Sequence, residues 1–199
     1  MRDAKNIAQV CMLPIDFIGF IFYSKSPRFA DKKLARKTAL SIPRHIQKTG
    51  VFVDADMEYI NDMEEYYMLD AVQLHGSETP EMCAEIRETG KTVIKAFGIG
   101  AGFDFGQLEA YESSCDYFLF DTKSDKHGGT GAKFDWEMLR AYNNRLPVFI
   151  SGGIGEEDAL AVKELSWLNV AGIDLNSKFE TAPAMKNIDM LEGFIKKVK

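Results

Sequence analysis

The chain has 199 residues, of which 46% are hydrophobic and 27% are charged, and this composition is typical of a globular protein with one sizeable core. The net charge of −6 argues against nucleic acid and anionic membrane surfaces as partners. The three cysteines lie far apart without a CxxC spacing, which indicates reduced thiols in the cytoplasm and no metal site. The sequence holds no apolar run of membrane-spanning length, and its first residues do not resemble a signal peptide.

Seven short segments are rich in Val, Ile and Phe, and each has about the length of a buried strand. Several are almost continuously apolar, as expected of parallel strands that are covered on both faces. In chain order, the predicted strands span residues 16–23, 50–54, 71–75, 92–97, 117–121, 147–151 and 170–175.

Helical patterns lie between these strands. Thr79-Pro80-Glu81 is a start signal for one helix, and acidic residues fill the first turn of another, at 156–165. Alternating strands and helices with short links predict a parallel α/β fold, organised as a single domain over residues 1–199. The predicted helices span residues 4–12, 31–40, 56–69, 81–89, 104–112, 135–142, 156–165 and 188–198.

The predicted helices outnumber the strands by one, because no strand precedes the helix at residues 4–12. A (β/α)₈ TIM barrel needs eight of each. We therefore interpret the sequence as a (β/α)₈ barrel whose first strand is missing and would precede Met1. A doubly wound open sheet, which needs no closure, is the rival architecture.

In a barrel, functional residues gather in the loops that follow the strands. Arg28 comes after the strand at 16–23, and its planar cation suits phosphate or carboxylate, although a solvated surface role fits equally well. His75 ends the strand at 71–75, where a histidine can donate a hydrogen bond or titrate near neutral pH. A packed histidine without a functional role is the alternative.

Asp121 ends the apolar strand at 117–121. An apolar edge favours the neutral form of a carboxyl group, which suits a general acid. The glycine-rich stretch at 123–131 is suited to close over a substrate, and it is neither a Walker loop nor a dinucleotide-binding motif. The alternative is that Asp121 caps this loop.

Two further strand ends favour an anion. Gly152 and Gly153 precede the helix at 156–165, so the backbone can approach a ligand there. Asn176 and Ser177 follow the last predicted strand, and phosphate sites built from the last two loops recur in barrels. A simple turn explains either segment alone, but together they favour phosphate binding.

Five stretches, in order along the chain, resemble phosphoribosylanthranilate isomerase. The resemblance implies a TIM barrel that converts N-(5′-phosphoribosyl)anthranilate to 1-(2-carboxyphenylamino)-1-deoxyribulose 5-phosphate without cofactor or metal. It also implies a small phosphosugar as the ligand, and we expect a monomer or a homodimer. The stretches are GFIFYSKSPR (19–28), VQLHG (72–76), LFDTKSDKHGGTG (119–131), FISGGI (149–154) and GIDLNSKFE (172–180).

Carried over residue by residue, the resemblance makes Asp121 the general acid. It places Arg28 and His75 at the substrate, and it gives Asp174 a supporting role. The chain departs from the family at Asn176-Ser177-Lys178, where the family often has Ser-Ser-Gly. The phosphate is expected at the backbone of Gly152, Gly153, Asn176 and Ser177.

The family's general base is a cysteine in a Lys-Ile/Val-Cys-Gly motif at the end of the first strand, and Met1-Arg2 resemble the residues that follow that motif. Neither Cys11 nor Cys83 nor Cys115 occupies an equivalent position. We therefore expect this chain to be inactive or nearly so, either because it starts at an internal methionine or because it is a genuinely shortened protein.

Two alternatives to an isomerase remain. The chain could be a non-catalytic phosphosugar-binding barrel that kept the pocket and lost the base. It could also be a sister barrel enzyme such as indoleglycerol-phosphate synthase, whose chemistry needs Lys and Glu at strand ends. Lys95 is the only lysine that we expect to point into the barrel, which makes this second alternative weak.

Overall fold

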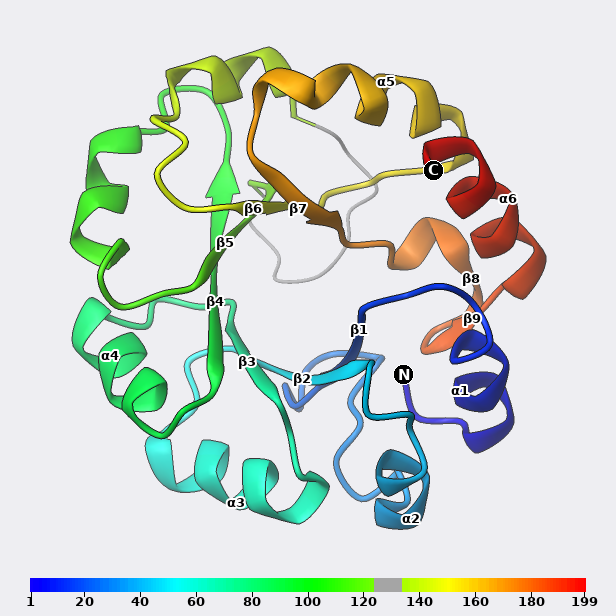
Figure 1. Cartoon of the computed structure of the whole chain (residues 1–199). Helices are drawn as coiled ribbons and strands as arrows, with labels where there is room; N and C mark the ends of the chain where they lie inside the picture. The colour runs from blue at the N-terminus through cyan, green and yellow to red at the C-terminus, as the bar shows by residue number, and fades with distance from the viewer. Residues whose placement is uncertain (124–133) are drawn as a thin grey trace.

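The structure is a computed structural model, and it describes residues 1–123 and 134–199. Its main feature is a curled, seven-stranded parallel sheet in which each strand pairs with the next one along the chain. Helices surround the outside of the sheet (Figure 1). The strands are β1 (Phe17–Ile21), β2 (Gln47–Phe52), β3 (Ala71–Leu74), β4 (Thr92–Ile99), β5 (Tyr117–Thr122), β6 (Val148–Ile150) and β7 (Val170–Ile173).

The sequential strand order excludes the doubly wound alternative, in which the order reverses within the sheet. It agrees with the barrel-like α/β architecture that the strand and helix pattern predicts. The α-helices are α1 (Ala4–Val10), α2 (Arg36–Leu40), α3 (Met57–Tyr67), α4 (Pro80–Glu88), α5 (Ala159–Lys163) and α6 (Ile188–Val198). The 3₁₀ helices are η1 (Phe105–Tyr111), η2 (Trp136–Ala141), η3 (Glu156–Asp158), η4 (Glu164–Trp167) and η5 (Ser177–Phe179).

Several predicted helices are shorter or tighter than expected. The helix predicted at 31–40 begins only at Arg36, because Lys32 has a left-handed backbone with φ of 58°. Asp104 and Asp135 each bind the backbone N–H two residues later, and this tight start suits the 3₁₀ helices η1 and η2. The helix predicted at 156–165 divides into η3, α5 and the start of η4, where Leu165 is not helical.

Apolar side chains fill both faces of the sheet. A small cluster made only of strand residues occupies the inner face, and a much larger core lies between the sheet and the helices. Parallel strands that are buried on both faces give the almost continuous apolar runs seen in the sequence. The inner cluster consists of Ile94, Ala96, Leu119 and Phe149, with Phe17 and Tyr117 packed against it.

Lys95 does not point into the barrel, and that prediction is wrong. It lies between the inner-facing Ile94 and Ala96, and side chains alternate between the two faces of a strand. Its side chain is therefore in the helix layer, where Nζ lies 3.0 Å from Glu78 Oε2 and donates to the Gly76 carbonyl oxygen at 2.7 Å. The inward lysine that would have favoured a sister synthase is absent at this position.

A two-stranded antiparallel hairpin follows β7 and was not expected from the sequence. It consists of β8 (Glu180–Ala182) and β9 (Met185–Lys186). Asn6 of α1 exchanges two hydrogen bonds with the backbone of Lys186, at 2.9 and 2.7 Å. The hairpin therefore lies beside the N-terminal helix (Figure 1).

The outer edges of β1 and β7 have no neighbouring strand among the residues that the structure describes. The Met1 nitrogen donates a hydrogen bond to the Gly19 carbonyl oxygen at 2.7 Å, so the first residue lies along the edge of β1. Across residues 1–123 and 134–199, none of the helices has the length and apolar character needed to cross a membrane.

Candidate active site

His75 and Asp121 meet at the carboxyl edge of the sheet. His75 directly follows β3, and Asp121 is the penultimate residue of β5. His75 Nε2 lies 3.3 Å from Asp121 Oδ2. Gln73 Nε2 lies 2.8 Å from His75 Nδ1. An amide nitrogen only donates, so Nδ1 accepts and Nε2 carries the ring hydrogen. The Nε2 side of the ring therefore faces the Asp121 carboxyl group.

Gly152 packs directly against Asp121. It follows β6 with φ of 93°, a conformation that side chains rarely adopt. A Cβ atom at this position would lie 2.7 Å from the Thr122 nitrogen and 2.9 Å from Asp121 Oδ1. Gly153 is also left-handed, with φ of 62°. Gly152 therefore brings bare backbone against the carboxyl group of Asp121.

Asp174 supplies a second carboxyl group at the same edge. It follows β7, and its Oδ2 accepts a hydrogen bond from Ser151 Oγ at 3.2 Å. Burial raises the pKa of Asp174; the negative charge of Asp121 acts in the same direction, while Lys186 and His75 oppose it. The edge thus holds two carboxyl groups, Asp174, which is hydrogen-bonded to Ser151, and Asp121, with 28% of its side chain exposed. Two carboxyl groups in unlike surroundings can divide acid and base roles.

Arg28 is held by a carboxylate that the sequence analysis did not single out. Its Nε donates to both oxygens of Glu180, at 3.0 and 2.9 Å, and its Nη2 lies 2.7 Å from Glu180 Oε2. The side chains of Arg28 and Glu180 are 14% and 4% exposed, so this fork-shaped pair is largely shielded from water. Arg28 is therefore fixed in direction and is not a freely solvated surface cation.

Asn176 is tied to the same hairpin. Lys186 Nζ donates to Asn176 Oδ1 and to the Leu175 carbonyl oxygen, both at 3.0 Å. Ser177 begins η5, a 3₁₀ turn of three residues, so no long helix N-terminus faces a ligand here. The loop after β7 is thus anchored by a lysine from β9.

The structure brings the predicted residues to one edge of the sheet, at the ends of β1, β3, β5, β6 and β7. It adds four polar side chains to them: Gln73, Ser151, Glu180 and Lys186. Gln73, Ser151 and Glu180 lie inside the family-like stretches, whereas nothing in the sequence around Lys186 indicates a role. The expected glycine-rich lid lies largely at 124–131, outside the described residues.

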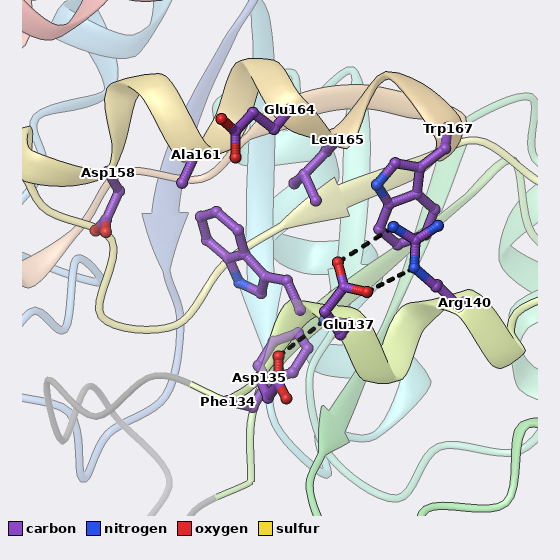
Figure 2. A pocket seen from close by; sticks show the side chains of 10 residues that line it. Phe134, Asp135, Glu137, Arg140, Asp158, Ala161, Glu164, Leu165 and Trp167 are labelled. Carbon is purple, nitrogen blue, oxygen red and sulfur yellow. Dashed lines mark hydrogen bonds and ion pairs between the residues drawn. The ribbon is translucent and has the colours of Figure 1, made fainter.

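A separate pocket of about 440 Å³ lies away from this edge (Figure 2). It is lined by residues of η2, α5 and η4, and Arg140 stacks on the Trp167 ring with 4.4 Å between the guanidinium carbon and the ring centre. Glu137 pairs with Arg140 at its mouth. None of the predicted site residues lines this pocket, and we therefore place the candidate site at the strand edge.

Comparison with known proteins decides the family. A family model described as N-(5'phosphoribosyl)anthranilate (PRA) isomerase matches residues 1–197. The chain belongs to the phosphoribosylanthranilate isomerase family. A Parabacteroides distasonis protein named N-(5'-phosphoribosyl)anthranilate isomerase is 42% identical over 199 residues, which cover 100% of this chain and 90% of that relative.

Solved structures of phosphoribosylanthranilate isomerases share the fold. The enzyme from Thermotoga maritima superposes with a TM-score of 0.88 at 32% identity, and the match covers 100% of this chain and 95% of that one. A phosphoribosylanthranilate isomerase in complex with reduced 1-(o-carboxyphenylamino)-1-deoxyribulose 5-phosphate superposes with a TM-score of 0.85 at 30% identity, covering 100% and 94%. The resemblance found in the sequence is therefore confirmed. Neither the expected inactivity nor the non-catalytic alternative finds support in these comparisons.

The three cysteines lie away from the strand edge, as the sequence analysis predicts. Cys11 caps the end of α1, and Cys83 is buried on α4. Cys115 is buried just before β5. Their positions do not allow any of them to contact a ligand held between Asp121 and Gly152. Among the described residues, no group of three His, Cys, Asp or Glu side chains is arranged to hold a metal ion.

Proposed function

We propose that the strand edge isomerises N-(5′-phosphoribosyl)anthranilate, with Asp121 as the general acid. In this reaction an acid protonates the ring oxygen of the sugar, and the ring opens. A base then removes the proton on C2′, and the resulting enol tautomerises to the ketone. Family membership establishes the isomerase activity, and the assignment of residues to these steps is our proposal.

The contact between His75 and Asp121 is the observation that carries the acid assignment. Asp121 stands at the end of a buried strand, lies 3.3 Å from His75 Nε2 and retains 28% exposure of its side chain. It is therefore oriented, yet a ligand can reach it. A carboxyl group held in this way is suited to give a proton to a ring oxygen and to take it back later.

The phosphate is proposed to bind at the backbone of Gly152 and Gly153 and of Asn176 and Ser177. Gly152 leaves its backbone uncovered next to Asp121, and Gly153 shares its left-handed conformation, which supports this assignment. Lys186 adds a nearby positive charge through its contact with Asn176. Arg28 and His75 are assigned to the remainder of the substrate, and Asp174 has the supporting role of shaping the charge around Asp121.

We further propose that the complete barrel has an eighth strand between β1 and β7. A (β/α)₈ barrel closes only with eight strands, and both of these edges lack a strand neighbour in the described part of the chain. The resemblance to the family implies a general-base cysteine on that strand. Adding a strand that carries Lys-Val-Cys-Gly before Met1 tests this directly. We expect kcat to rise, and an unchanged kcat would show that the cysteine is not needed.

The cellular location and the oligomeric state of the enzyme are also proposals. We place it in the cytoplasm, which its three unpaired cysteines support, and we propose that it acts as a monomer or homodimer on a small phosphosugar. Isomerisation is tested by following the disappearance of N-(5′-phosphoribosyl)anthranilate with the unsubstituted chain. Loss of conversion in Asp121→Asn, with retained binding of the reduced product analogue, would support the acid role.

A further inference from the structure

The hairpin β8–β9 sends two charged side chains toward the candidate site. Glu180 begins β8 and Lys186 ends β9, and their side chains are 4% and 10% exposed. Lys186 Nζ lies 3.4 Å from Glu180 Oε1. Charged groups are rarely buried to this degree unless they are paired, so their contacts indicate what the hairpin does.

Within residues 1–123 and 134–199, Glu180 is the acceptor found on the Arg28 guanidinium group, and it occupies one edge only. The carboxylate accepts from Nε and Nη2 of Arg28, which leaves Nη1 and the second Nη2 hydrogen for other partners. A guanidinium bound on one edge cannot rotate away from the partner on its other edge. Glu180 therefore fixes the direction in which Arg28 can offer hydrogen bonds to an anion.

Glu180 is also held in its charged form. Burial alone would raise its pKa, but hydrogen bonds from Arg28 and the charge of Lys186 outweigh this effect and hold the pKa below its ordinary value. A hydrogen bond from the Ala184 backbone N–H, at 3.2 Å, adds to the same preference. The carboxylate thus remains available to both cations at neutral pH.

Lys186 extends the network to the loop after β7. Its Nζ contacts Asn176 Oδ1, the Leu175 carbonyl oxygen and Glu180 Oε1. One carboxylate thereby links the loop after β1, which carries Arg28, to the loop after β7, which carries Asn176. These two loops are far apart in sequence and lie on the two outer strands of the sheet.

We propose that Glu180 is a positioning residue. It orients Arg28 directly and orients the loop after β7 through Lys186, so that the hydrogen-bond donors for two anionic groups of the substrate are already in place before binding. This inference rests on the proposed function, because it needs Arg28 and Asn176 to contact the substrate. It assigns a role to the hairpin, which no predicted catalytic or phosphate-binding residue occupies. Preset donors lose less freedom on binding than mobile ones, which strengthens binding without a new contact.

A double-mutant cycle separates this role from simple support of the fold. Glu180→Gln, Arg28→Gln and the double variant are compared with the unsubstituted chain for binding of reduced 1-(o-carboxyphenylamino)-1-deoxyribulose 5-phosphate by calorimetry, and for KM and kcat. We expect Glu180→Gln to weaken binding about tenfold. When Arg28 is already replaced, we expect Glu180→Gln to add less than about twofold, because its effect acts through Arg28.

Asn6→Ala is the matched control for loosening of the hairpin. Asn6 is buried and pairs with the Lys186 backbone, and in the described part of the chain it forms no hydrogen bond with Arg28 or Glu180. We expect it to lower the free energy of unfolding and to leave affinity for the analogue within about twofold. If Asn6→Ala weakened binding as much as Glu180→Gln did, positioning by Glu180 would be overturned.

A measurement that needs no ligand completes the test. In the unsubstituted chain the Arg28 Nε hydrogen should exchange slowly with water by NMR, and Glu180→Gln should make it exchange quickly. Rapid exchange in the unsubstituted chain would overturn the inference even if binding were normal. Absence of both turnover and analogue binding, with a protected Arg28 Nε hydrogen, would instead contradict the proposed function and leave the Arg28–Glu180 pairing established.

Discussion

His75 Nε2 lies 3.3 Å from Asp121 Oδ2, and the opposite ring nitrogen of His75 faces the Gln73 amide. This arrangement joins β3 to β5 across β4 at the edge where substrate is proposed to bind. It also fixes which ring nitrogen carries the hydrogen, because the Gln73 amide nitrogen only donates. The ring is therefore oriented between Gln73 and Asp121, with Nε2 on the Asp121 side.

The first prediction concerns the His75 tautomer. Nitrogen NMR at pH 7.5 should show hydrogen on Nε2 and none on Nδ1. Replacing Gln73 by Leu removes the donor to Nδ1, so the population with hydrogen on Nδ1 should rise and kcat/KM should fall about tenfold. A ring that carries its hydrogen on Nδ1 in the unsubstituted chain would contradict the geometry.

The second prediction concerns the buried ion pair in the helix layer. Lys95 and Glu78 have side chains only 3% and 1% exposed, so Lys95→Met leaves a buried carboxylate without its partner. We expect the free energy of unfolding in urea to fall by about 3 kcal/mol. Activity per folded molecule should stay unchanged, because Lys95 faces away from the site. Lys33→Met, at an exposed position, is the control and should be nearly neutral.

The third prediction follows from the raised pKa of Asp174. Because the folded protein holds this proton more tightly than the unfolded chain, Asp174 stabilises the fold most below its ordinary pKa of 3.8. That contribution is lost as pH rises from this value through the raised pKa of the folded state. Asp174→Asn removes the titration and keeps the shape of the side chain. Its stability relative to the unsubstituted chain should therefore increase from pH 4 to pH 8 in urea unfolding. A stability difference between the two proteins that stays constant over this pH range would contradict a raised pKa of Asp174.

The fourth prediction separates backbone strain from close approach. Gly152 and Gly90 both have left-handed backbones, with φ of 93° and 82°, but a Cβ at Gly90 would have no heavy atom within 4 Å. Gly90→Ala should cost only the strain of about 1 kcal/mol. Gly152→Ala should destabilise further and reduce analogue binding, since its Cβ would press on Thr122 and Asp121. Equal effects of the two substitutions would remove the argument for close approach at Gly152.

The position of the candidate site at the carboxyl ends of the strands can be predicted from the sequence, because the parallel strands are apolar runs that end in polar residues. Asp121, His75 and Gly152 each stand at or just after the end of such a run, so topology alone brings them to one edge. The direction of Lys95 could not be read in the same way. Both faces of β4 are buried, and in such a strand the apolar pattern does not reveal which side faces the interior.

The hairpin escaped prediction for a different reason. Strands of three and two residues carry no usable periodicity, and β8 and β9 are of these lengths. The pairing of Glu180 with Arg28 joins residues 152 positions apart, which no local pattern reports. Long-range polar contacts of this kind become visible only in the folded chain, and here they connect two of the predicted binding loops.

The most direct test is the rate of N-(5′-phosphoribosyl)anthranilate isomerisation by the unsubstituted chain and by Asp121→Asn, with Asp62→Asn as an exposed control. The account predicts conversion above the uncatalysed rate, a loss of about a hundredfold or more in Asp121→Asn, and no loss in Asp62→Asn. Binding of the reduced product analogue to Asp121→Asn should persist. Equal rates for Asp121→Asn and the unsubstituted chain, or no conversion by the unsubstituted chain, would contradict the account.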